Sequence, residues 1–212
     1  MKLLTYTSNP FGVNTYICYD PVTLECAIID PGMALPEERE GLKELLEKYG
    51  LKPVHLINTH LHLDHVFGNE FVRKEYGLKL KANERDAFLG ETLGQQKRMF
   101  GMYDNGATEQ IEEYLSDGDE IRIGEGSLKV LEVPGHSPGG IALYSKEDGF
   151  VITGDSLFQG SIGRTDLPGG DMDTLINALN KKLMTLPDDT KVYPGHGNPT
   201  TIGFERRNNP FL

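Results

Sequence analysis

Several residue types are scarce in this chain of 212 residues. Tryptophan is absent, there are two cysteines, and no apolar run is long enough to cross a bilayer. Because one pair of cysteines makes no disulfide framework, Cys18 and Cys26 are expected to be small buried side chains. The N-terminal stretch MKLLTYTSNP is interrupted by polar residues and lacks the pattern of a secretory signal. We therefore expect a cytoplasmic protein with no membrane partner.

Basic residues are also scarce, with 21 Lys and Arg against 32 Asp and Glu and a formal net charge of −11. A chain this acidic repels phosphate backbones, so we expect no nucleic-acid partner. Its hydrophobic fraction of 38% is ordinary for a globular protein. The sequence has no low-complexity tract, linker or fixed-period repeat. A single domain over residues 1–212 is therefore expected.

Short strands and helices alternate along the chain. Helices are expected after Pro36, over about 66–76 and over 172–185, because apolar residues recur there at helical spacing. Residues 84–116 are expected to be mainly helical, with a mobile stretch around 101–106. Strands are expected at 14–20, 25–30, 54–60, 79–82, 120–123, 128–133, 141–145, 150–154 and 191–197. Two sheets with helices on their outer faces, an α/β sandwich, would bury these elements.

The motif with the clearest chemistry is T-H-L-H-L-D-H at residues 59–65. Imidazole and carboxylate together suit zinc, iron or manganese. On extended chain, side chains two residues apart point the same way, so His60 and His62 can meet one ion. Asp64 and His65 follow a turn and can face a second ion. A polar surface loop is the alternative, but such loops seldom gather four ligand types within six residues.

Three further candidates lie at the ends of apolar runs. His136 and His196 each follow a glycine, which lets the backbone turn sharply close to a site. Asp155 ends the run FVITGD, where a carboxylate can bridge two cations or serve instead as a turn or helix-cap residue. With five candidate histidines elsewhere, we favour the bridging role. The remaining histidine, His55, is expected to be a packed or surface side chain.

These motifs, with P-G-H-S-P-G-G, T-G-D-S-L-F and P-G-H-G, resemble the metallo-β-lactamase superfamily in order and spacing over nearly the whole chain. The resemblance implies an αββα sandwich with metals at one edge. G-S-I-G-R-T-D-L-P-G-G-D at 160–171 and the C-terminal E-R-R-N-N-P-F-L are similar to the small, single-domain glyoxalase II-like hydrolases. That resemblance implies a thioester hydrolase acting on a small molecule through a metal-bound hydroxide.

The resemblance also implies two divalent metals, expected to be zinc, with iron or manganese as alternatives. Their ligands would be His60, His62 and His136 for the first metal, Asp64, His65 and His196 for the second, and Asp155 between them. Asp64 would also orient the attacking water. Arg164 falls where glyoxalase II has a substrate-holding basic residue, although an ion pair with Asp166 or Asp171 would explain it equally well.

Two departures from related branches bear on the substrate. Full glyoxalase II has a helical C-terminal domain that helps grip glutathione, and this chain ends before such a domain. True β-lactamases lack the bridging aspartate, so Asp155 argues against antibiotic hydrolysis. The alternatives are a persulfide dioxygenase with one iron on His60, His136 and Asp155, or a metal-binding module without turnover. Seven ligands argue against the module, since structural sites close with four.

Overall fold

The computed structural model describes residues 1–212, and its strands form two six-stranded sheets and one short pair. The first sheet has the order β1-β2-β3-β4-β5-β6, and its strands are Lys2–Ser8, Val13–Tyr19, Glu25–Ile29, Lys52–Ile57, Leu80–Ala82 and Glu113–Tyr114. The second has the order β14-β13-β10-β9-β8-β7, which in that order are Thr200–Thr201, Lys191–Pro194, Phe150–Gly154, Ile141–Ser145, Gly126–Glu132 and Glu120–Ile123. The separate pair is β11 (Leu157–Phe158) with β12 (Ser161–Ile162).

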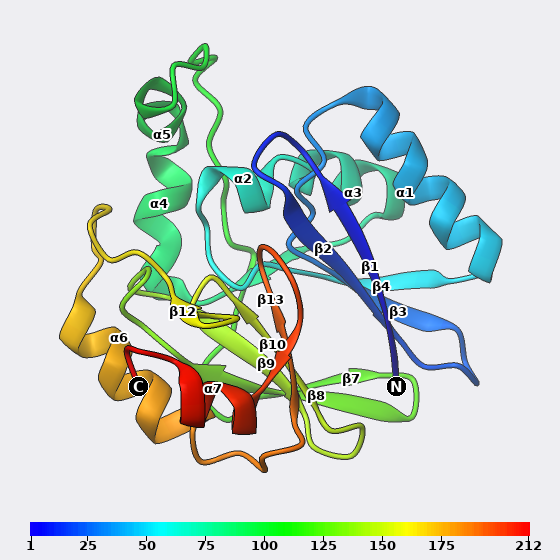
Figure 1. Cartoon of the computed structure of the whole chain (residues 1–212). Helices are drawn as coiled ribbons and strands as arrows, with labels where there is room; N and C mark the ends of the chain where they lie inside the picture. The colour runs from blue at the N-terminus through cyan, green and yellow to red at the C-terminus, as the bar shows by residue number, and fades with distance from the viewer.

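The helices lie outside the two sheets and at one end of them (Figure 1). They are α1 (Pro36–Tyr49), α2 (Leu63–Val66), α3 (Asn69–Tyr76), α4 (Ala87–Glu91), α5 (Leu93–Met99), α6 (Met172–Ala178) and α7 (Ile202–Asn208), with a 3-10 turn η1 (Glu84–Asp86) and a π turn η2 (Leu179–Leu183). None of them has the length and apolar character that a membrane crossing requires.

Three apolar layers hold this arrangement together. Leu42 and Leu46 of α1 pack with Ile28 and Leu56 on the outer face of the first sheet. Between the sheets, buried side chains of β2, β3 and β4 meet those of β8, β9 and β10. On the far side, α6 and α7 cover the second sheet. The expected α/β architecture, two mixed sheets with helices on their outer faces, is confirmed.

The two cysteines are free and buried, as expected. Cys26 faces the layer under α1, whereas Cys18 on the neighbouring strand faces the layer between the sheets. Because alternate residues of a strand point to opposite faces, these thiols point away from each other.

Several element boundaries differ from the sequence expectations. The helix expected over 66–76 is broken into α2 and α3 at Gly68, whose N–H donates to the Pro31 carbonyl at 2.7 Å. The strand expected to reach residue 60 ends at Ile57, and the helix over 172–185 becomes a π turn from Leu179. In each case a tertiary contact or a local turn overrides the periodic pattern.

Candidate metal centre

The candidate ligands sit on loops at one edge of the sandwich. Strands β8, β10 and β13 run in the same direction, since β9 is antiparallel to both β8 and β10 while β13 is parallel to β10. Their carboxyl ends therefore meet at one edge, from which the loops to His136, Asp155 and His196 emerge. Across the gap, the loop after β4 carries His60, and Ile141 N donates to Thr59 O at 2.9 Å.

His60, His62 and His136 form the first group of candidate ligands, and all three are buried. Nδ1 of His62 and Nε2 of His136 face each other at 2.9 Å. The His60 ring lies 4.8 Å from the His62 ring and 4.9 Å from the His136 ring, centroid to centroid. Three imidazoles thus converge on one small space, as ligands of a single ion do.

Asp64, His65 and His196 form the second group. Nε2 of His196 lies 3.2 Å from Oδ2 of Asp64 and 3.3 Å from Nε2 of His65. Asp64 and His65 stand in the single turn of α2, which begins directly after His62. The helix turn thereby directs these two side chains to a different point from the first group.

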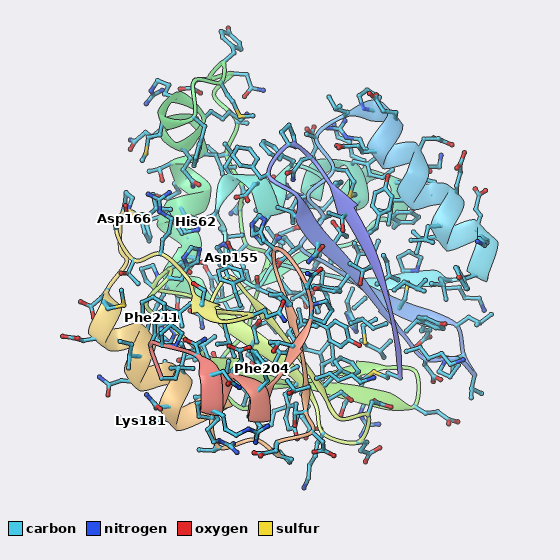
Figure 2. The ribbon with its side chains drawn as sticks, viewed as in Figure 1. His62, Asp155, Asp166, Lys181, Phe204 and Phe211 are labelled. Carbon is cyan, nitrogen blue, oxygen red and sulfur yellow. The ribbon has the colours of Figure 1, made fainter.

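Asp155 lies between the two groups. Its Oδ2 is 3.7 Å from Nε2 of His136 in the first group and 3.4 Å from Nε2 of His196 in the second. Its Oδ1 is 3.4 Å from Nε2 of His65. Figure 2 shows Asp155 close to His62, beside helix α4. A carboxylate in this position can serve two ions at once.

The donor set fits a pair of divalent metal ions. Nε2 of His60, Nε2 of His62 and Oδ1 of Asp155 are buried without a hydrogen-bond partner, although buried polar atoms are normally paired. The backbone also passes very close to these ligands, because a side chain at Gly195 would overlap the Asp155 carboxylate and the His65 ring. Glycine there lets the chain pass close beside the centre.

The outer nitrogens of three of the rings lie close to oxygen atoms outside the centre. Nδ1 of His65 lies 3.1 Å from Oδ2 of Asp30, Nδ1 of His136 lies 2.7 Å from the Arg164 carbonyl, and Nδ1 of His196 lies 3.0 Å from the Phe11 carbonyl. Such contacts fix the orientation and tautomer of ligating histidines. Asp30 also groups with His60 and His65, but its oxygens already accept from Thr59 N and Oγ1 and from Asn58 Nδ2, so it supports the centre from outside.

Two further buried side chains hold the ligand loops, and no sequence motif predicts either of them. Asp86 Oδ2 accepts from Leu61 N at 3.0 Å and from Ser137 Oγ at 2.9 Å, and its Oδ1 accepts from Gly139 N at 2.6 Å. Gln96 Oε1 accepts from Leu63 N at 2.9 Å, and its Nε2 donates to Leu61 O. The backbone on both sides of His62 is therefore fixed by side chains from η1 and α5.

The first group is electrostatically prepared for a cation. Burial, followed by the neighbouring imidazoles, lowers the pKa of His60 well below 6.5 and that of His62 to about 3. Burial also lowers the pKa of His136. Neutral imidazole is the form that binds metal, so no proton needs to leave these rings at neutral pH.

The second group behaves in the opposite way in the metal-free chain. Burial alone would lower the pKa of His196, but hydrogen bonds to Asp155 and Asp64 outweigh it and raise the pKa to about 10. Burial likewise opposes protonation of His65, yet Asp155, Asp64 and Asp30 raise its pKa well above 6.5. In the metal-free chain, protons on His65 and His196 therefore supply the positive charge beside these carboxylates. A metal ion bound here would displace those protons.

Arg164 and His55, for which the sequence allowed two roles each, lie in different parts of the structure. Arg164 lies at the rim of the centre, and its Nε and Nη2 each donate to Asp166 at 2.7 Å, whereas Asp171 caps α6. Figure 2 shows Asp166 on a loop at the edge of the molecule. His55 lies away from the centre, with Nε2 2.8 Å from the Arg122 carbonyl.

Comparison with known proteins identifies the class. The family model of the metallo-beta-lactamase superfamily matches residues 9–196, and the chain belongs to this family. It is 41% identical to hydroxyacylglutathione hydrolase GloC of Haemophilus influenzae, over 88% of this chain and 86% of that protein. It is 38% identical to the probable metallo-hydrolase YqgX of Bacillus subtilis, over 100% and 98%. The superfamily is one of metal-dependent hydrolases in general, and its fold with these His and Asp clusters implies divalent metals.

Solved structures agree on the fold. The crystal structure of BLEG-1, described as a B3 metallo-beta-lactamase, matches with a TM-score of 0.90 and 32% identity over 100% of this chain and 99% of that one. TTHA1623 in a di-iron-bound form matches with a TM-score of 0.85 and 36% identity, over 99% and 100%. ETHE1 from Myxococcus xanthus matches with a TM-score of 0.80 and 28% identity, over 99% and 84%.

Proposed function

We propose that this chain is a dinuclear metal-dependent thioester hydrolase, similar in activity to hydroxyacylglutathione hydrolase. The observation that carries the proposal is the pair of ligand groups joined by Asp155 on the floor of one cavity. The 41% identity to GloC supports the same reaction. The partner would be a small-molecule thioester, with no role for nucleic acid or a membrane.

In this proposal His60, His62 and His136 hold the first metal, and the second group holds the other. Two ions bound there would supply Lewis acidity and lower the pKa of a shared water toward neutrality. Asp64, whose Oδ2 faces His196, is placed to orient that water.

The lining of the cavity favours a thioester over an amide. Its carboxylates are Asp64 and Asp155, both beside histidines, and it contains no Lys, Tyr, Glu or Cys. An amine leaving group needs a proton from a general acid. A thiolate, with a conjugate-acid pKa of about 8.5, leaves without one.

We propose zinc as the native metal pair. Imidazole and carboxylate ligands also accept iron and manganese, and TTHA1623 crystallised in a di-iron-bound form. Metal analysis of protein purified without added metal, together with the activity of each reconstituted form, decides between them.

The test is cleavage of S-lactoylglutathione by metal-replete protein, with His62→Ala as the defective variant and His55→Ala as its matched control. We expect rapid cleavage in the wild type and in His55→Ala. His62→Ala should lose at least about 100-fold, because changing a residue that merely supports a metal ligand already costs about 10–100-fold. A chromogenic cephalosporin is run in parallel because of the likeness to BLEG-1. Absence of thioester cleavage by protein carrying two metals would refute the proposal.

A second candidate is a persulfide dioxygenase with one iron on His60, His136 and Asp155, which the likeness to ETHE1 favours. His65→Ala separates the two functions, because a one-iron enzyme of this type does not use that ring as a ligand. If the protein is a two-metal hydrolase, thioester cleavage should be lost in this variant. If it is a one-iron dioxygenase, oxygen uptake with a persulfide should persist. Full metal occupancy with neither activity would favour a non-catalytic module.

A further inference from the structure

Two hollows meet at the metal centre, and their walls differ in chemistry. The first is a cavity of about 330 Å³ whose walls come from the β1–β2 loop, α4, α5 and the loop before α6. Its apolar wall residues are Phe11, Phe88, Met99, Phe100, Leu167 and Pro168. The second is a more open cleft, where Phe158 stands beside the polar side chains of Gln159, Ser161 and Asn198. His136, Asp155, Arg164 and His196 border both hollows.

Apart from the metal centre, the apolar cavity offers no unpaired Lys or Arg to an anionic ligand. Arg164 is the only Lys or Arg in its lining, and its Nε and Nη2 already donate to Asp166. The basic residues of α5 are also paired outside the lining, Lys97 with Asn105 and Arg98 with Asp104. The carboxylates of a peptide such as glutathione would therefore find only one guanidinium here, and that one is already paired.

The polar groups of the cavity wall are mostly occupied as well. Thr92 Oγ1 donates to the Phe88 carbonyl at 2.7 Å, and the Gln96 amide is bonded to the ligand loop and to Leu89 O. Among the amide and hydroxyl side chains of this lining, only Gln95 has no such bond, so most polar substituents would lose water partners without replacing them, which is unfavourable. An apolar substituent has no such cost.

The wall also exposes apolar surface that a ligand would cover. Phe88 is 37% exposed, Phe100 47% and Met99 60%. Phe11 stacks on Phe67 with ring centroids 6.5 Å apart and meets Phe100 edge-on at 5.3 Å, so the aromatic wall is braced. The Phe11 carbonyl at the same time contacts Nδ1 of His196, which places this wall directly beside the centre.

We propose that the cavity binds the acyl group of the substrate, and that this group is a medium-length aliphatic or an aromatic one. The polar thiol carrier then lies in the open cleft beside Gln159, Ser161 and Asn198. This inference rests on the proposed thioester hydrolysis and names the substrate class for it. Phe11, Phe100 and Met99 are the residues that select the acyl group.

The first measurement is binding of two thioethers that cannot be hydrolysed, S-methylglutathione and S-hexylglutathione, to the metal-loaded protein by calorimetry. Each methylene buried on an apolar wall is worth about a fourfold change in affinity, so the hexyl compound should bind at least about 100-fold more tightly. In Phe100→Ala this ratio should fall by about tenfold or more. Tyr103→Ala is the matched control, because Tyr103 is 87% exposed nearby and does not line the cavity.

The second measurement is kcat/KM for acetyl, butyryl, hexanoyl and lactoyl thioesters of glutathione. We expect kcat/KM to rise with acyl length and the lactoyl ester to be cleaved more slowly than the butyryl ester. Equal binding of the two thioethers would overturn the acyl assignment. A kcat/KM that stays constant or falls with acyl length, while the acetyl thioester is cleaved, would overturn it as well. Either result would leave thioester hydrolysis standing. If no thioester is cleaved by the two-metal protein, the proposed function fails and this inference fails with it.

Discussion

Replacing Asp86 by asparagine should loosen both loops that carry the three-histidine group. The Asp86 carboxylate is fully buried and accepts from Leu61 N, Ser137 Oγ and Gly139 N, which flank His60, His62 and His136. Asparagine keeps the shape but turns one oxygen into a donor that faces another donor. The variant therefore loses a charge-assisted hydrogen bond and gains a repulsive contact.

The expected loss of stability in Asp86→Asn is the difference between the hydrogen bonding it loses and the burial cost of a charge that it avoids. A hydrogen bond to a charged group contributes about 1.5–3 kcal/mol, and an unpaired buried donor costs a similar amount. Burial raises the pKa of Asp86, so a neutral side chain recovers part of this loss. We expect a net destabilisation of about 2 kcal/mol, or about 4–8 °C in Tm for a chain of this size. Affinity for the first metal should fall about 10–100-fold.

Thermal unfolding of the metal-free protein measures the first effect, and competition with a chelator, monitored by metal content, measures the second. Asp166→Asn is the matched control, since this aspartate is exposed and a surface change alters stability by about 0.5 kcal/mol or less. If Asp86→Asn has the Tm and the chelator competition curve of the wild type, Asp86 does not hold the ligand loops.

Three other outcomes are expected. Asp155→Ala should lose metal and activity together, and full metal content in this variant would contradict the bridging role. In the metal-free protein the pKa of His196 is about 10, above its unfolded value of 6.5, so its stabilising contribution is complete below pH 6.5 and is lost as pH rises toward 10. The Tm of chelator-treated protein should accordingly fall between pH 7 and 10, and a constant Tm would count against the ion pairs. Cys18 and Cys26 are buried with pKa raised to about 12, so neither should react with iodoacetamide at pH 8 until the protein is unfolded.

Sequence patterns predict the elements whose stability is local. Helix α1 is an example, because Pro36 stands in its first turn, Leu42 and Leu46 share a buried face, and Gly50 ends it with a φ of 64°. Strand β1 was not predicted, since it lies at a sheet edge and its residues are largely half-buried or exposed. Strands β6, β11, β12 and β14 have two residues each and owe their form to their neighbours.

The candidate ligands could be predicted because their types are rare and their spacing is distinctive, and the structure gathers the seven into one place. Asp86 and Gln96 could not, because their partners lie 25 to 53 residues away along the chain and depend on how α4 and α5 dock. Asp30 could not be predicted either, because its contact with His65 arises only when β3 and β4 pair.

The second ligand group distinguishes the two enzymatic candidates, the two-metal thioester hydrolase and the one-iron dioxygenase. His65 is oriented from outside by Asp30, and His196 is oriented by the Phe11 carbonyl. Asp64 completes the group, 3.2 Å from His196. An enzyme with one iron on His60, His136 and Asp155 has no use for three further polar side chains directed at a second point. Their arrangement is accounted for by a second metal, which is why we favour hydrolysis over oxygenation.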